Sequence, residues 1–99
     1  MKLHVHSAAL RELEQAVTHY EEERPGLGLE LLDAVEETVA FAAENPAAGE
    51  RRDEAVGARR FVVKRFPYLV YVTRIGGAAQ VVAIAHASRR PAYWRERLK

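Results

Sequence analysis

The sequence predicts an α+β fold in which an antiparallel helical hairpin packs on a mainly antiparallel sheet, in the element order β-α-α-β-β-β. Two observations carry this prediction. Apolar residues recur every three or four positions through the first half of the chain, and from Arg59 onward the pattern becomes that of extended strands. With 99 residues, of which 48% are hydrophobic, the chain has room for one core, so we expect a single domain over residues 1–99.

The first strand and the first helix are expected within residues 1–24. Leu3 and Val5 alternate with polar neighbours, which is typical of a short strand with one buried face. Ser7 is the expected N-cap of the helix, because its hydroxyl can accept a hydrogen bond from the first turn. The helix is expected to end before Pro25-Gly26. Its predicted apolar stripe consists of Leu10, Leu13, Val17 and Tyr20.

A second helix is expected to follow this junction and to end at Asn45-Pro46. Its predicted apolar stripe consists of Leu27, Leu31, Leu32, Val35, Val39 and Ala42. Because the connection between the two helices is short, we expect them to pack as antiparallel neighbours. Residues 47–58 have little apolar pattern, and we expect a loop there.

Three strands are expected in the second half of the chain. The first covers residues 59–66 and ends at Pro67, and its alternation places Phe61 and Phe66 on opposite faces. Residues 68–73 form the second strand, and Gly76-Gly77 is expected to make a two-residue hairpin turn. The third strand, over residues 81–85, is continuously apolar and is expected to be central and buried on both faces. A basic and aromatic tail follows, with a short helical turn.

The charges are divided between the two halves of the sequence. Residues 1–50 carry three basic and eleven acidic side chains, a net charge of −8, whereas residues 51–99 carry twelve basic and three acidic ones, a net charge of +9. Two explanations are open. The halves attract each other within the fold, or the second half presents a cationic face to an anionic partner such as a phosphate backbone or an acidic polypeptide segment.

A basic and aromatic set from the predicted strands and tail is the strongest candidate for a functional site. RNA cleavage without a metal needs a base, an acid and cations that stabilise the phosphate in the transition state. His86 would transfer a proton, while Arg65 and Arg89 would supply positive charge. Tyr93 or Trp94 would stack on a base. The alternative is an arginine-rich surface that is attracted to the acidic helices within the fold, with both aromatic residues covering the sheet edge. The full set comprises Arg59, Arg60, Lys64, Arg65, Arg74, His86, Arg89, Arg90, Tyr93, Trp94, Arg95 and Arg97.

The sequence predicts neither a metal site, nor a cofactor, nor a membrane segment. It contains no cysteine, and His4 and His6, which share one strand face, are fewer than the three or four ligands of a zinc site. No apolar window approaches the ~20 residues that span a membrane, so we expect a cytoplasmic protein. Four carboxylates on the expected helix surfaces have no positioned partner and are expected to serve solubility: Glu12, Glu30, Asp33 and Glu37.

Three segments of the sequence stand out as motifs. They are the helix junction Pro25-Gly26-Leu27-Gly28, the run RFVVKRFPYLVY over residues 60–71, and the run HASRRPAYW over residues 86–94. Together they resemble the RelE/ParE superfamily of toxins from bacterial type II toxin–antitoxin systems. The resemblance spans nearly the whole chain, and the expected element order is that of the superfamily fold.

The resemblance implies a small cytoplasmic toxin that is silenced by a cognate antitoxin protein and reaches operator DNA only through that antitoxin. An antitoxin segment, partly disordered when free, would bury apolar side chains in grooves beside the helical hairpin and the sheet, and would set acidic groups against the basic face. Members of the superfamily differ in their targets. RelE-like members cut mRNA on the ribosome, ParE-like members inhibit DNA gyrase, and the fold alone does not choose between them.

Residue matching favours the ParE-like branch. RelE-like nucleases carry an arginine at the position of Tyr68, and the FPY and PxYW spellings are ParE-like. The resemblance therefore implies a non-enzymatic gyrase inhibitor. The alternatives are a ribosome-dependent mRNA endonuclease and a non-toxic, antitoxin-binding and autoregulatory module. The expected target- or antitoxin-binding residues are Arg60, Lys64, Arg65, Arg89, Arg90, Tyr93, Trp94 and Arg95. The catalytic residues of the nuclease alternative would be Arg65, His86, Arg89 and Tyr93.

Overall fold

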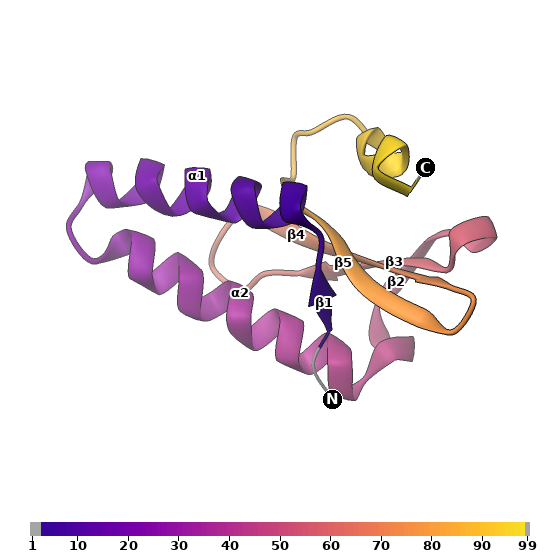
Figure 1. Ribbon diagram of the computed structural model, residues 1–99. Coiled ribbons are helices and arrows are strands. Elements are labelled where there is room, and N and C mark those ends of the chain that lie inside the picture. Colours follow the sequence, from indigo (N-terminus) through magenta and orange to yellow (C-terminus); the bar gives the residue numbers. More distant parts are fainter. Residues whose placement is uncertain (1–2, 99) are drawn as a thin grey trace.

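The computed structural model describes residues 3–98 and confirms the predicted α+β fold. Its helices and strands are β1 (His4–Val5), α1 (Ser7–Glu23), α2 (Leu27–Glu44), β2 (Glu50–Asp53), β3 (Ala58–Val62), β4 (Tyr68–Ile75) and β5 (Ala78–His86), and its 3-10 helices are η1 (Pro46–Ala48), η2 (Glu54–Val56) and η3 (Tyr93–Leu98). The strands form one sheet in the order β1-β5-β4-β3-β2 (Figure 1). β1 pairs with β5 in parallel, and the other pairings are antiparallel.

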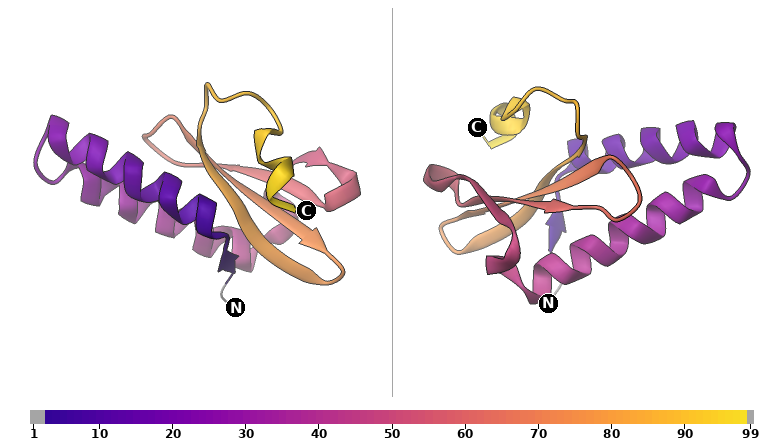
Figure 2. Two further views of the ribbon diagram at one scale, coloured as in Figure 1. Left: turned by 45° about the horizontal axis from the view of Figure 1, so that its top comes forward. Right: turned by 180° about the vertical axis from the view of Figure 1, so that it is seen from behind.

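α1 and α2 form the predicted antiparallel hairpin and lie against one face of the sheet (Figures 1 and 2). The N-cap of α1 is His6 rather than Ser7, so this prediction was wrong. The backbone of His6 is extended, and its Nδ1 accepts a hydrogen bond from the Ala8 N–H at 3.0 Å. His6 also continues the pairing of β1, because its N–H donates to the Val81 carbonyl at 2.9 Å. Strand and helix are therefore separated by this one residue.

The buried face of α1 is rotated about the helix axis relative to the predicted apolar stripe. Ala9, Leu13 and Ala16 are the buried residues of the helix, whereas Leu10, expected in the apolar stripe, is about half exposed. The two alanines are small enough to let α1 lie close against β5, so the helix packs on their side rather than on the side of Leu10. Glu12 lies next to this buried face.

The turn between the helices is fixed by one carboxylate and two glycines. Glu21 in α1 accepts backbone hydrogen bonds from Gly26 at 2.8 Å and from Gly28 at 3.0 Å, and it thereby satisfies the N-terminus of α2. Gly26 has a φ of 91°, a left-handed conformation that glycine adopts without strain. Gly28 is needed because a Cβ at this position would lie 2.5 Å from the carbonyl oxygen of Val17. The conspicuous glycines of this junction thus have a structural role.

Replacing Gly28 by alanine is expected to lower the free energy of unfolding by about 1–3 kcal/mol, since the added methyl group meets backbone that cannot rotate away. Helix propensity alone would favour alanine by about 1 kcal/mol. Urea unfolding followed by circular dichroism measures the difference. Leu29→Ala, at the exposed neighbouring position, is the control and should change stability by about 0.5 kcal/mol or less. A Gly28→Ala protein more stable than its parent would contradict the close approach of the two helices.

Residues 47–58, predicted to be a loop, contain a fifth strand and two short helical turns. β2 pairs antiparallel with β3 through Glu50 opposite Arg60 and Arg51 opposite Arg59. The prediction was wrong because all four residues of β2 are charged. An edge strand that buries little of either face shows no apolar alternation, so its sequence carries no strand signal.

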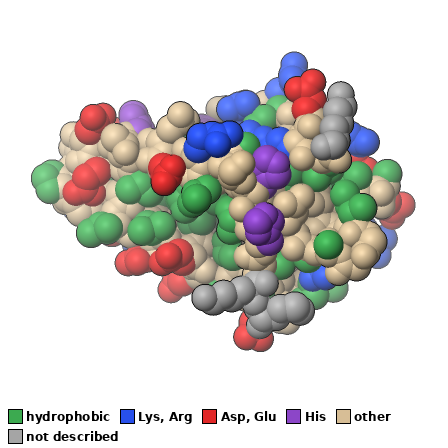
Figure 3. All heavy atoms as spheres, viewed as in Figure 1, with side chains coloured by type: hydrophobic (Ala, Val, Ile, Leu, Met, Phe, Trp, Pro, Cys, Tyr) green, Lys and Arg blue, Asp and Glu red, His purple; other side chains and the backbone are tan. Residues whose placement is uncertain are grey.

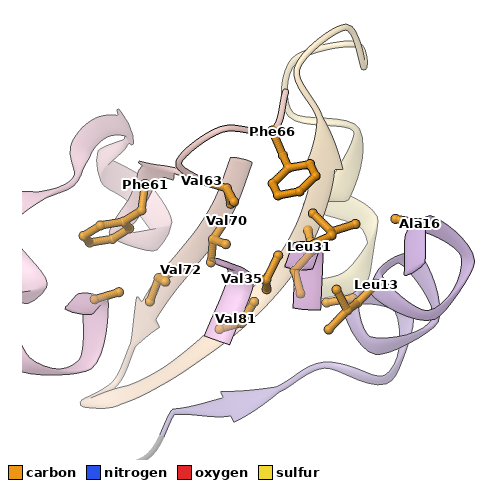
Figure 4. Packing of buried hydrophobic residues seen from close by; sticks show 13 residues of the cluster. Leu13, Ala16, Leu31, Val35, Phe61, Val63, Phe66, Val70, Val72 and Val81 are labelled. Atoms are coloured by element: carbon orange, nitrogen blue, oxygen red, sulfur yellow. The ribbon is translucent and has the colours of Figure 1, made fainter. Parts of the chain in front are cut away.

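The turn after β3 brings Phe66 into the core that faces the helices. β3 ends at Val62 rather than at residue 66, and Arg65 has a φ of 72°, which breaks the extended alternation. Phe61 and Phe66 therefore lie in the same apolar cluster, together with residues of both helices (Figure 4). The predicted placement of these two rings on opposite faces was wrong.

β4 and β5 form a hairpin that has a buried apolar cluster on each of its two faces. Gly76 and Gly77 make its turn with φ values of 57° and 83°, as predicted. Residues 81–85 of β5 are all buried, also as predicted. On the helix side they continue the cluster of Figure 4. On the opposite side lies η3, which confirms the predicted helical turn (Figure 2). It covers a second cluster, which contains Leu69, Tyr71, Ala83, Ala85 and Trp94.

Within residues 3–98, no helix is both long enough and apolar enough to cross a membrane. In the same part of the chain, no three side chains of the metal-binding types cluster as ligands.

Candidate functional site

The basic and aromatic tail folds back onto the sheet face opposite the helices (Figure 2). Trp94 is 1% exposed, and its ring centroid lies 5.6 Å from that of Tyr71 in β4. Ala92 has a φ of 61°, and this left-handed residue turns the chain just before η3. Trp94 therefore anchors the tail and covers the sheet, in agreement with the alternative interpretation of the basic and aromatic set. Its ring is not part of the accessible surface.

Tyr93 and Arg97 of η3 both bind Glu12 of α1. The Arg97 guanidinium donates to both carboxylate oxygens of Glu12, each at 2.9 Å, and the Tyr93 hydroxyl donates to Oε2. Burial alone would raise the pKa of Glu12, but the hydrogen bonds from Arg97 and Tyr93 outweigh it and the pKa is lowered. Burial and the bond to Glu12 raise the pKa of Tyr93. Glu12 was predicted to serve solubility only, and this was wrong.

Arg89 and Arg90 lie exposed on the turn between β5 and η3. The Arg89 guanidinium stacks 3.9 Å from the centroid of the Tyr93 ring, a cation–π contact. The turn is closed by two hydrogen bonds of 3.0 Å, from the Ser88 N–H to His86 Nδ1 and from the Arg89 N–H to the His86 carbonyl. In the described part of the chain, neither guanidinium forms an ion pair. This turn therefore presents two adjacent positive charges to solvent.

Two further residues of the predicted binding set are engaged within the fold. Arg65, in the turn after β3, pairs with Glu30 of α2 at 2.6 Å, and this contact lowers the pKa of Glu30. Glu30 thus has a positioned partner, contrary to the prediction. Arg95 of η3 pairs with Asp53 at the end of β2. Both arginines are exposed, so these ion pairs contribute little to stability.

Arg60 and Lys64 belong to a different surface, a groove of about 840 Å3 between α2 and β3. Apolar side chains also line it, and among them Phe41 is 51% exposed and Val62 is 70% exposed. A second groove of about 450 Å3 runs between α1, α2 and β1 and is lined almost entirely by apolar side chains. Figure 3 shows apolar side chains along this helical face. The C-terminal half of α2 is thus flanked by two grooves, one lined by apolar and charged side chains and the other almost entirely apolar.

Ion pairs inside the fold account for only part of the charge division. Within residues 3–98, the first-half carboxylates that pair with second-half cations are Glu12, Glu30 and Glu50. Acidic side chains are also spread over the outer helical surface (Figure 3). The described cations that form no ion pair are Arg11, Arg59, Lys64, Arg74, Arg89 and Arg90. Attraction between the halves therefore explains some of the pattern and leaves several exposed arginines free to meet a partner.

The nuclease alternative relies on four side chains, three of which have hydrogen-bond partners outside the set. The four are Arg65, His86, Arg89 and Tyr93. The Tyr93 hydroxyl is bound to Glu12, and His86 Nδ1 accepts the Ser88 N–H. Among the described residues, no side-chain hydrogen bond links two members of the set. Arg89 and Tyr93 make the stacking contact described above.

A protein-family model described as "ParE toxin of type II toxin-antitoxin system, parDE" matches residues 3–91. The chain belongs to the ParE toxin family. The ParE match includes the Arg89-Arg90 turn and ends before η3.

A solved structure supports the ParE assignment. A chain of the "Chromosomal ParDE TA system from P. aeruginosa" superposes on this one with a TM-score of 0.72. The two sequences are 25% identical, and the match covers 87% of this chain and 95% of that chain. Among curated proteins, none matches the sequence.

In this ParE chain, Glu12 is the site residue that sequence reasoning missed. A signal for it existed, because Ala9 and Ala16 stand three positions before it and four after it, on the same side of the helix. Small residues at that spacing indicate a face that packs closely. Its partners Tyr93 and Arg97 are 81 and 85 residues away in sequence, beyond the range of any local pattern.

Proposed function

We propose that this chain is the toxin of a parDE-type module, that it arrests growth in the cytoplasm by binding DNA gyrase, and that a cognate antitoxin neutralises it. In this proposal the chain acts by binding, without a cofactor, and it reaches operator DNA only through the antitoxin. Membership of the ParE family supports the module, and the structure named for a ParDE system supports an antitoxin as partner.

The observation that carries the target assignment is the exposed Arg89-Arg90 pair on its closed turn. Two guanidinium groups without carboxylate partners in the described chain suit an anionic surface on a protein target or on its bound DNA. Stacking of Arg89 on Tyr93 restricts its side chain before binding, so less conformational entropy is lost on contact. Arginines held in this way are typical of energetically dominant interface residues.

The antitoxin is assigned to the two grooves beside α2. Exposed Phe41 and Val62 offer apolar contact, and Lys64, which forms no ion pair within residues 3–98, offers a positive charge beside them. An amphipathic segment with acidic side chains fits such a surface. The two grooves lie on either side of α2, so the antitoxin would wrap around this helix rather than occupy a single site, and the Arg89-Arg90 turn lies outside both grooves.

The test is a gyrase assay with the purified chain. The expected result is loss of ATP-dependent supercoiling with accumulation of cleaved DNA, and reversal of both by the co-purified antitoxin. In cells, induction of the chain alone should produce DNA breaks while pulse-labelled protein synthesis continues.

A different order of events would overturn the assignment. Cessation of protein synthesis before any DNA damage would point to mRNA cleavage and to the nuclease alternative. Unimpaired growth with tight antitoxin binding would point to the non-toxic module.

A further inference from the structure

One carboxylate, Glu12, joins three elements of the fold. Its Oε1 accepts the Ile84 N–H at 3.0 Å and an Arg97 N–H at 2.9 Å, and its Oε2 accepts the second Arg97 N–H and the Tyr93 hydroxyl. The side chains of Glu12 and Arg97 are 15% and 18% exposed. A paired carboxylate and guanidinium so withdrawn from water, with four donors on one acceptor group, form a firm contact between α1, β5 and η3.

The position of this contact follows from an irregularity in β5. Tyr71 pairs with Ala83 and Val72 pairs with Val81, so Val82 is an extra residue in the ladder. The Val82 carbonyl accepts a hydrogen bond from Arg97 at 2.9 Å. Arg97 and Glu12 thus satisfy the backbone of β5 at Val82 and Ile84, where β1 no longer pairs with it.

A continuous set of contacts leads from Glu12 to the exposed arginines. Glu12 holds the Tyr93 hydroxyl, and the face of the same ring carries the Arg89 guanidinium at 3.9 Å. Arg97 lies 5.0 Å from the centroid of this ring as well. Ala92, between Arg89 and Tyr93, has a left-handed backbone. A residue with a side chain keeps this conformation only where surrounding contacts hold it, so we expect the turn to depend on the docking of η3.

We infer that Glu12 is a positioning residue: through Tyr93 and Arg97 it holds the C-terminal segment so that Arg89 and Arg90 are presented to the target. This inference rests on the proposed function, in which that turn contacts the target. The Glu12 side chain is largely buried, and its carboxylate is bound by groups of this chain. Removing its charge should increase the population in which η3 is undocked and leave the grooves beside α2 intact.

The experiment compares Glu12→Gln and Tyr93→Phe with the parent chain and with Glu14→Gln, an exposed carboxylate of the same helix. Tyr93→Phe keeps the ring on which Arg89 stacks and removes only the hydroxyl, so it remains informative if Glu12→Gln folds poorly. Three properties are measured: the rate of tryptic cleavage after Arg89 and Arg95 in the native protein, growth arrest on induction, and affinity for the antitoxin.

The expected result for Glu12→Gln is cleavage roughly tenfold faster or more, because proteolysis follows the population of the opened segment and a charge-assisted contact is lost. Growth arrest should require several times more inducer, while antitoxin affinity stays within about twofold. Tyr93→Phe should show the same changes to a smaller extent, and Glu14→Gln should match the parent.

Two outcomes would overturn the inference. Unchanged cleavage in both variants would mean that Glu12 does not hold the segment. Faster cleavage with undiminished growth arrest would mean that the segment need not be held for toxicity. Failure of the proposed function is seen separately: an Arg89→Ala, Arg90→Ala chain that arrests growth as well as the parent, with normal cleavage after Arg95, shows that the target contacts another surface.

Discussion

Trp94→Ala is expected to be the most destabilising single substitution in the described chain, with a loss of about 3–5 kcal/mol in the free energy of unfolding. The indole is 1% exposed and packs with Tyr71 on the sheet face away from the helices. The other side chains there are mostly small, so its removal leaves a cavity that neighbouring residues cannot fill. Domains are stable by roughly 5–15 kcal/mol, so the loss is a large part of the total.

Urea unfolding followed by far-UV circular dichroism measures this effect, since the chain has a single tryptophan and the variant has no tryptophan fluorescence. Trp94→Phe is the informative partner variant. The indole Nε1 has no hydrogen-bond partner among the described residues, so phenylalanine loses volume without breaking a hydrogen bond and should cost less than half as much. Leu29→Ala is again the exposed control. A Trp94→Ala chain as stable as its parent would show that η3 is not docked on the sheet in solution.

The double variant Arg89→Ala, Arg90→Ala is expected to abolish growth arrest. If each arginine contributes about 2 kcal/mol to target binding, as interface arginines often do, affinity falls roughly thirtyfold for each and further for both. Folding should change by about 1 kcal/mol or less, because both side chains are exposed and only Arg89 has an aromatic contact. The two measurements are gyrase inhibition by the purified variant and its melting temperature, each compared with that of the parent chain.

The matched control for this pair is Arg74→Ala. Arg74 is also exposed and forms no ion pair within residues 3–98, but it lies near the opposite end of β4, beside the Gly76-Gly77 turn. Arg74→Ala removes one positive charge and the double variant removes two, so an effect of charge alone would weaken Arg74→Ala about half as much in free energy. Growth arrest that survives the double variant but not Arg74→Ala would move the target surface to the other end of the sheet.

Most of the fold could be predicted because its elements have local signals. The two helices, the Gly76-Gly77 turn and the buried run of β5 follow from periodicity and turn chemistry. β2 could not be predicted, since charged edge strands have no apolar alternation. The face of Phe66 was missed for a related reason: alternation holds only while the backbone stays extended, and the left-handed Arg65 ends it.

The candidate site was less predictable than the fold because side-chain accessibility depends on tertiary contacts. The same basic and aromatic run contains Trp94, which is buried, and Arg90, which is exposed. Composition cannot separate them. Glu12 resembles any helix carboxylate until the chain brings Arg97 beside it, and the sequence gives only the small residues around it as a sign.

The two edges of the sheet differ from its interior strands in a way that affects how copies of the chain behave when concentrated. One edge, β1, is two residues long, and the other, β2, is a row of charged side chains. Short or charged edges are poor templates for strand addition, so they oppose the edge-to-edge growth that leads to amyloid-like aggregates. The edges of this ParE-family chain therefore disfavour polymerisation through its sheet, and contacts between copies are left to its side-chain surfaces.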